Sequence, residues 1–114
     1  MKILILPTVV FKEINDATRE FFDLLADLGD IVGVPRTITS ANDGNHRGSA
    51  APGQPSNSRH YKNLAWDSRS HDLTEREKMA VVDFSKRSLG SDWDFILENA
   101  GTANEHFHCE YDPK

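Results

Sequence analysis

The chain has 114 residues, which is enough for one domain and too little for a second hydrophobic core. Its apolar fraction is 38%, and no apolar run approaches the ~20 residues that a membrane-spanning helix needs. The net charge of -5 and the single cysteine argue against a nucleic-acid-binding surface and exclude an internal disulfide framework.

The first part of the chain predicts a strand followed by a helix. The apolar run 2–6 is typical of a buried strand. Apolar residues recur at helical spacing over 15–28, which predicts an amphipathic helix that packs against a core. Either Asn15 or Asp16 is suited to its N-cap, and Gly29 fits the C-terminal cap position.

A second strand and a long polar segment follow this helix. β-branched residues favour a strand over 34–39. Between residues 40 and 59 the only apolar side chains, prolines aside, are three alanines. Irregular segments of about 20 residues are uncommon inside compact domains and are usually functional or disordered. We interpret 40–59 as a functional loop because His60 follows it directly, with a disordered surface loop as the alternative.

The second half of the chain predicts three more strands and one more helix. The strands cover residues 61–68, 94–98 and 106–111. The helix covers 74–89, and its first residues, Thr74 to Glu77, have the sequence of a capping box. Turn-type residues separate the last two strands, which predicts an antiparallel hairpin. These elements predict one α+β domain over 1–114, with an antiparallel sheet and two main helices.

The predicted last strand carries two imidazoles and a carboxylate on one face. Side chains alternate along a strand, so His106, His108 and Glu110 share one face while Phe107 and Cys109 face the core. Neutral imidazole is a common zinc ligand, and a neighbouring carboxylate often orients it. The alternative is a polar strand face that contacts only solvent.

Two further residues of the zinc-ligand type, His60 and Asp67, stand at the two sides of the transition from the loop to the strand predicted over 61–68. A catalytic zinc needs three protein ligands and an open position for water. His60, Asp67 and His108 would supply two nitrogens and one oxygen, so the sequence predicts a Zn²⁺ site made by these three residues. The alternatives are a solvated loop residue for His60 and a turn or salt-bridge carboxylate for Asp67.

Two motifs, in this order, resemble those of the zinc D-alanyl-D-alanine peptidases. Segment 58–67 resembles the family's S-x-H-x-x-G-x-A-x-D motif, and Glu105-x-x-His108 resembles its second motif. The resemblance covers 37–114 and implies the Hedgehog/DD-peptidase fold; the chain looks like the small phage-encoded murein peptidases of this family. Asn63 stands where the family has Gly, and Asn is the next most tolerant residue for a left-handed backbone.

The resemblance implies a zinc metallopeptidase that hydrolyses peptide bonds of bacterial peptidoglycan stem peptides, as a D,D-carboxypeptidase or endopeptidase of the endolysin type. Zinc-bound water would be the nucleophile, Glu105 the general base, and His106 a supporting or oxyanion-stabilising group. The family's substrate-binding arginine would be Arg47, with Arg36 as the second candidate. We expect a peptidoglycan peptide as partner, no nucleic acid, no membrane insertion and a monomer. We also expect a protein made in the cytoplasm without a signal peptide that acts on the cell wall.

Three other interpretations stay open. The chain could be a phage accessory or binding domain of the same fold that binds zinc without catalysis. Glu105 separates these two cases, because Glu105→Gln would abolish hydrolysis only in an enzyme. A metal-dependent nuclease is suggested by Asn45, His46 and the histidine-rich strand, although the acidic balance counts against it. The last is a small structural protein whose proposed ligands do not converge.

Overall fold

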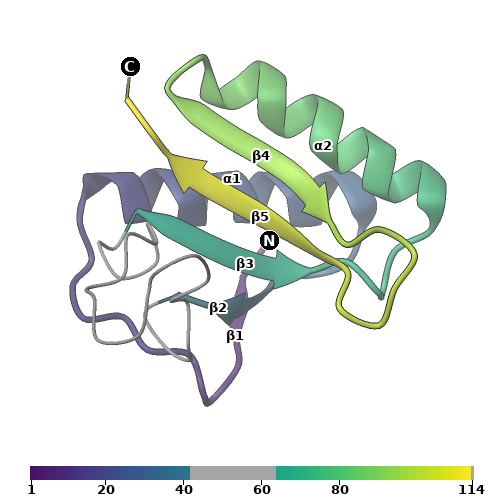
Figure 1. Ribbon diagram of the computed structural model, residues 1–114, viewed down its shortest axis with the longest axis horizontal. Coiled ribbons are helices and arrows are strands. Elements are labelled where there is room, and N and C mark those ends of the chain that lie inside the picture. Colours follow the sequence, from purple (N-terminus) through teal and green to yellow (C-terminus); the bar gives the residue numbers. More distant parts are fainter. Residues whose placement is uncertain (42–63, 114) are drawn as a thin grey trace, which may run out of the picture.

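The computed structural model describes residues 1–41 and 64–113. In chain order the elements are β1 (Leu4–Ile5), α1 (Asp16–Val32), β2 (Thr37–Ser40), β3 (Ala65–Arg69), α2 (Glu75–Leu89), β4 (Trp93–Glu98) and β5 (His106–Tyr111). The strands form one sheet in the order β1-β2-β3-β5-β4. Figure 1 shows α1 crossing behind this sheet and α2 lying along its β4 side. The architecture is a small α+β domain, as the sequence predicts.

The sheet is mixed, which corrects the prediction of an antiparallel sheet. β1 runs parallel to β2, whereas the pairs β2–β3, β3–β5 and β5–β4 are antiparallel. The predicted hairpin is present, because β4 and β5 pair from Trp93 opposite Tyr111 to Glu98 opposite His106. β5 therefore lies between β3 and β4, so its side chains have neighbours on both sides.

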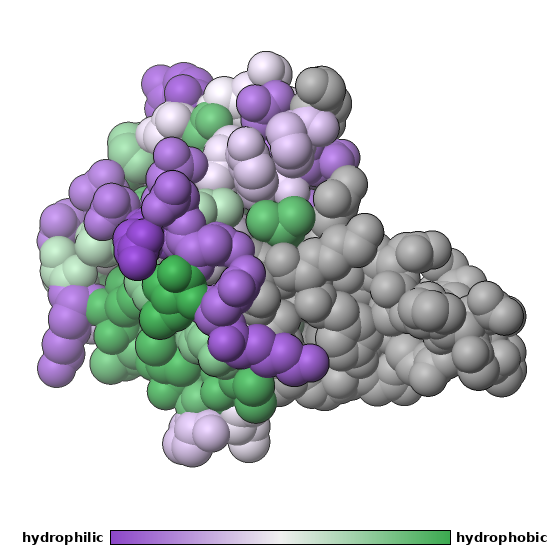
Figure 2. Space-filling view, turned by 90° about the vertical axis from the view of Figure 1, so that its left-hand side faces the viewer, coloured by the Kyte–Doolittle hydropathy of each residue, from purple (hydrophilic) through white to green (hydrophobic). Residues whose placement is uncertain are grey.

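β1 is shorter and more exposed than the buried strand predicted over 2–6. It has two residues, Leu4 and Ile5, which are 42% and 47% exposed. A strand at the edge of a sheet pairs on one side only, so its side chains are less enclosed. Val10 and Ile14, in the segment that leads to α1, are exposed as well, and Figure 2 shows apolar side chains gathered on that side of the molecule.

α1 has the predicted start and a later end. The side chain of Asn15 accepts a hydrogen bond of 2.9 Å from the backbone N–H of Thr18, which is an N-cap. The helix ends at Gly33, whose φ of 75° is left-handed and whose N–H donates to the carbonyl of Gly29. Gly29, the predicted cap, lies inside the helix because the apolar face continues to Val32, which packs against the core.

α2 begins with the predicted capping box. The backbone N–H of Thr74 donates to the Glu77 carboxylate at 2.8 Å, and the N–H of Glu77 donates back to the Thr74 hydroxyl at 3.2 Å. Within residues 1–41 and 64–113, neither helix has the length and apolar content needed to cross a membrane. A single small domain of this kind fits the expected monomer.

The two helices cover one face of the sheet. The ring of Trp66 on β3 stacks on Phe21 of α1, with centroids 4.9 Å apart, and Val81 of α2 lies in the same core cluster. Because side chains alternate along a strand, the intervening residues of β3, β4 and β5 point to the opposite face. We call this opposite face the imidazole face; it carries Asp67, Arg69, Asp94, Ile96, Glu98, His106, His108 and Glu110.

Candidate metal centre

The imidazole face brings both histidines of β5 beside carboxylates of the two neighbouring strands. Asp67 of β3 lies opposite His108, and Glu98 of β4 lies opposite His106. Nδ1 of His108 is 2.9 Å from Oδ1 of Asp67 and 3.3 Å from Oε1 of Glu98. Nε2 of His106 is 3.7 Å and 3.6 Å from the same two oxygens. Four polar side chains from three strands therefore converge on one small region.

This group could hold a metal ion. Asp67, Glu98 and His108 each offer one ligand atom, and these atoms lie within 4.8 Å of one another. Zinc binds imidazole nitrogen and carboxylate oxygen at about 2.0–2.2 Å, so a group of this size can close around one ion. The other ring nitrogen of His108, Nε2, lies 3.3 Å from the Glu110 carboxylate. Such a carboxylate on the second nitrogen is the usual partner of a zinc-ligating histidine.

The carboxylates around His108 change its affinity for a proton. Burial disfavours the imidazolium, but the hydrogen bond and charge of Asp67, with Glu110 and Glu98, outweigh it and raise the pKa of His108 to about 9. In the metal-free protein His108 is therefore protonated at neutral pH. Zinc needs the neutral imidazole, so metal binding here would release a proton.

We expect the metal-free protein to lose stability as the pH rises from about 6.5 to about 9. The pKa of His108 is higher in the folded chain than its ordinary 6.5, so its stabilising effect is complete below the lower value. That effect is lost as the pH passes through the higher value. Urea denaturation in the presence of a chelator measures this. His108→Gln should remove this part of the pH dependence and His71→Gln should keep it; full dependence in His108→Gln would contradict the assignment.

The structure brings together two of the three predicted zinc ligands, Asp67 and His108. The third, His60, and the predicted substrate arginine, Arg47, lie outside the described residues, as do all but the first two positions of the loop predicted over 40–59. His106, predicted as a supporting group, directs Nε2 toward Asp67 and Glu98. Its Nδ1 lies 2.7 Å from the backbone carbonyl of Asn104.

Glu105 lies on the other side of the sheet from these imidazoles. It is two residues before Phe107, which faces the core. Because side chains alternate along a strand, both residues point to the same side of the sheet. Its carboxylate pairs with Lys78 at 2.8 Å and accepts hydrogen bonds from the Ser70 hydroxyl at 2.7 Å and the Gly101 N–H at 2.9 Å. Lys78 foremost, then Gly101 and Ser70, lower the pKa of Glu105 to about 2. A carboxylate with such a pKa is a weak proton acceptor near neutral pH.

Arg36, the second candidate for the substrate arginine, is a structural residue here. It is 1% exposed, and it donates to both carboxylate oxygens of Asp72, at 3.0 and 3.2 Å, and to the backbone carbonyl of Arg69. A guanidinium held in this way joins the start of β2 to the end of β3. Arg69 itself is exposed on the imidazole face, opposite His106 in register.

Glu98 is a residue of the centre that the sequence motifs do not include. Its signal is present in the sequence, because Asp94, Ile96 and Glu98 alternate with the core residues of β4. What was missing is the register of the hairpin, which sets Glu98 opposite His106. The long connection 99–105 does not fix a register in the way that a two-residue turn does.

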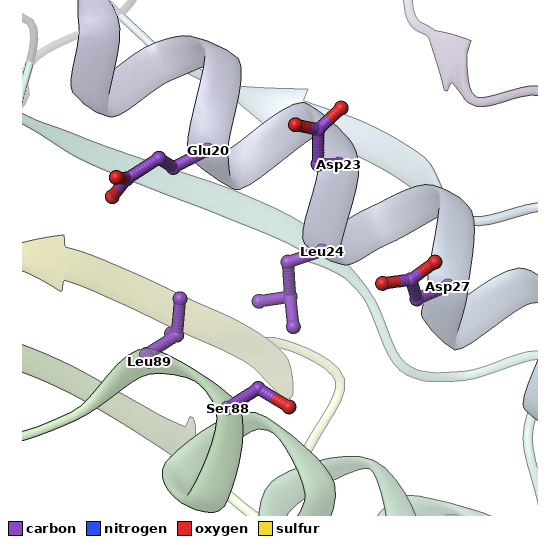
Figure 3. Close-up of a pocket in the computed structure, with 6 residues that line it drawn as sticks. All are labelled: Glu20, Asp23, Leu24, Asp27, Ser88 and Leu89. Carbon is purple, nitrogen blue, oxygen red and sulfur yellow. The ribbon is translucent and has the colours of Figure 1, made fainter.

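A separate pocket lies between the two helices. Its volume is about 280 Å³, and its lining residues are Glu20, Asp23, Leu24, Asp27, Ser88 and Leu89. Figure 3 shows the acidic side chains on the α1 side, with Ser88 and Leu89 of α2 across from Leu24. The lining contains carboxylates but no imidazole or thiol, so its donor set suits zinc less well than the imidazole face does.

Comparisons with known proteins give no relative from which a role could be transferred. No protein-family model, curated protein or solved structure matches this chain. The assignment of the candidate site therefore depends only on the donor atoms that the structure brings together. The specific Hedgehog/DD-peptidase fold stays a prediction.

Proposed function

We propose that this protein is a zinc-dependent hydrolase with its metal centre on the imidazole face. The observation that supports this most directly is the convergence of His108 Nδ1 with carboxylate oxygens of Asp67 and Glu98. Carboxylates this close to each other repel unless a positive charge lies between them. In the metal-free chain the His108 proton supplies that charge, and a zinc ion would replace it. The proposed ligands are Asp67, His108 and the sequence-predicted His60.

Each described residue of the centre has a definite task in this proposal. A bound zinc ion would supply a water of lowered pKa and would polarise a substrate carbonyl. Asp67 and His108 hold the ion, and Glu110 orients the His108 ring through Nε2. Oε1 of Glu98 takes up a proton beside the ligands and returns it to the leaving amine. Nε2 of His106, when protonated, donates to an oxygen that gains negative charge.

For the substrate we propose peptide bonds of peptidoglycan stem peptides. The support is the pair of sequence motifs, with His60 seven residues before Asp67 and Glu105 three residues before His108. The zinc peptidases that carry such motifs cut peptides containing D-alanine. The base role that the resemblance implies for Glu105 stays a prediction. Of the described carboxylates that are not proposed as ligands, Glu98 is the one beside both imidazoles, 3.3 Å from His108 and 3.6 Å from His106.

The contacts of Glu105 favour a second candidate function, a zinc-binding domain without hydrolytic activity. In a peptidase of this type the motif glutamate acts beside the metal, whereas here Lys78 holds it at 2.8 Å on the helix side. A binding domain would keep the zinc ligands and tolerate this arrangement. The two candidates differ in one result, because both bind zinc and only the hydrolase cleaves peptides.

The first test is the metal content of the purified protein. We expect about one zinc per chain after incubation with Zn²⁺ and gel filtration, measured by mass spectrometry of the metal. His108→Ala should lose this zinc, and His71→Ala, which changes an exposed histidine outside the centre, should keep it. A wild-type protein that stays free of zinc would overturn the proposal. Zinc binding without cleavage of purified muropeptides would favour the second candidate.

A further inference from the structure

A buried polar network lies on the helix side of the sheet, near the strand ends that lead to the metal centre. The Glu105 carboxylate accepts from Ser70 and Gly101 and pairs with Lys78. The side chains of Lys78 and Glu105 are 9% and 2% exposed. Lys78 also pairs with Glu75, but that carboxylate is 83% exposed, so Glu105 is the buried partner.

The members of this network are joined along the chain to the strands of the centre. Ser70 directly follows β3, which carries Asp67. Glu105 directly precedes β5, which carries both histidines. Gly101 lies in the connection that follows Glu98, the last residue of β4. One carboxylate therefore links the ends of all three strands of the centre, and Lys78 connects them to α2.

We infer that Lys78 and Glu105 are positioning residues for the metal centre. The ion pair holds the adjoining ends of β3, β4 and β5, and so keeps the ligands Asp67 and His108 at the spacing that one ion needs, with Glu98 beside them. Metal–ligand distances tolerate deviations of only about 0.2 Å, so a small shift of one strand end weakens binding. In this role Glu105 touches neither the metal nor the substrate. The inference rests on the proposed metal centre and adds the part of the fold that controls its affinity.

The effects of substituting Lys78 and Glu105 are not expected to be additive. Removing one partner leaves the other charge buried without its counter-ion, which is more disruptive than replacing both. Glutamine at position 105 keeps an oxygen that can accept from Ser70 or from the Gly101 N–H. The double variant Lys78→Met/Glu105→Gln should therefore disturb the strand ends less than either single change.

The test is the zinc dissociation constant of the full chain, measured by competition with a chromophoric chelator. Lys78→Met and Glu105→Gln should each weaken zinc binding by about 10- to 100-fold, and the double variant should recover most of the loss. The visible spectrum of the cobalt-substituted protein should shift in the single variants, since it reports ligand geometry. Val81→Ala is the control: Val81 is a fully buried α2 residue outside the network, so this variant should keep the wild-type affinity and spectrum.

Each outcome supports or overturns the inference. Ser70→Ala removes one hydrogen bond and should give a smaller loss of affinity, so it replaces Lys78→Met if that variant does not fold. Wild-type zinc affinity in both Lys78→Met and Ser70→Ala would overturn the positioning role alone. Unchanged zinc binding with lost hydrolysis in Glu105→Gln would do the same and assign Glu105 to the reacting groups. A wild-type chain without zinc affinity would overturn the proposed function itself.

Discussion

Glu98→Gln should reduce peptide hydrolysis by about 10²- to 10⁴-fold, the usual effect of removing a general base, while zinc stays bound. The carboxylate of Glu98 lies 3.3 Å from Nδ1 of His108 and 3.6 Å from Nε2 of His106. An amide has nearly the same shape as the carboxylate but does not take up a proton at neutral pH. The measurement is kcat on purified muropeptides, together with the zinc content of the same samples.

Two matched variants make this result specific to Glu98. Asp94→Asn removes a carboxylate from the same strand and the same face, four residues before Glu98 along β4, and should leave kcat near the wild-type value. Glu105→Gln should change kcat only in proportion to its loss of zinc. If Glu98→Gln loses its zinc, Glu98 is a ligand and not the proton acceptor. If Glu98→Gln keeps full activity, the proposed role is wrong.

The two-histidine strand could be predicted because its signal is local. The alternation that sets His106 and His108 apart from Phe107 and Cys109 lies within six consecutive residues, and the structure confirms β5 over the predicted range. The capping box at Thr74 is equally local and is confirmed. Such features depend on neighbours along the chain, so the sequence contains nearly all the information they need.

Features that depend on distant contacts could not be predicted in the same way. Whether β1 is buried depends on its place at the sheet edge, which the apolar run 2–6 does not reveal. The partner of Glu105 is Lys78, a residue of another element, and no spacing in the sequence connects the two. The strand alternation that places His106 and His108 on the imidazole face also places Glu105 on the core side. The motif resemblance gives only the spacing of Glu105 and His108 along the chain, so it does not show which side of the sheet Glu105 faces.

Trp66→Ala is expected to lower the free energy of unfolding by ~3–5 kcal/mol, the usual cost of truncating a large buried aromatic side chain. Trp66 is 1% exposed, and its ring stacks on Phe21 at 4.9 Å and on Trp93 at 6.0 Å. It therefore joins α1 to both β3 and β4. Urea denaturation of the metal-free protein, followed by circular dichroism, measures the loss.

The same substitution links the core to the metal centre. Trp66 directly precedes Asp67, so the backbone that packs Trp66 into the core also directs Asp67 to the imidazole face. Because Asp67 is held by the backbone that Trp66 anchors, we expect Trp66→Ala to weaken zinc binding as well. Ile96→Ala, which truncates a side chain 45% exposed on the imidazole face, should cost less than ~1 kcal/mol. An equally small loss for Trp66→Ala would mean that the aromatic stack does not hold β3 in place.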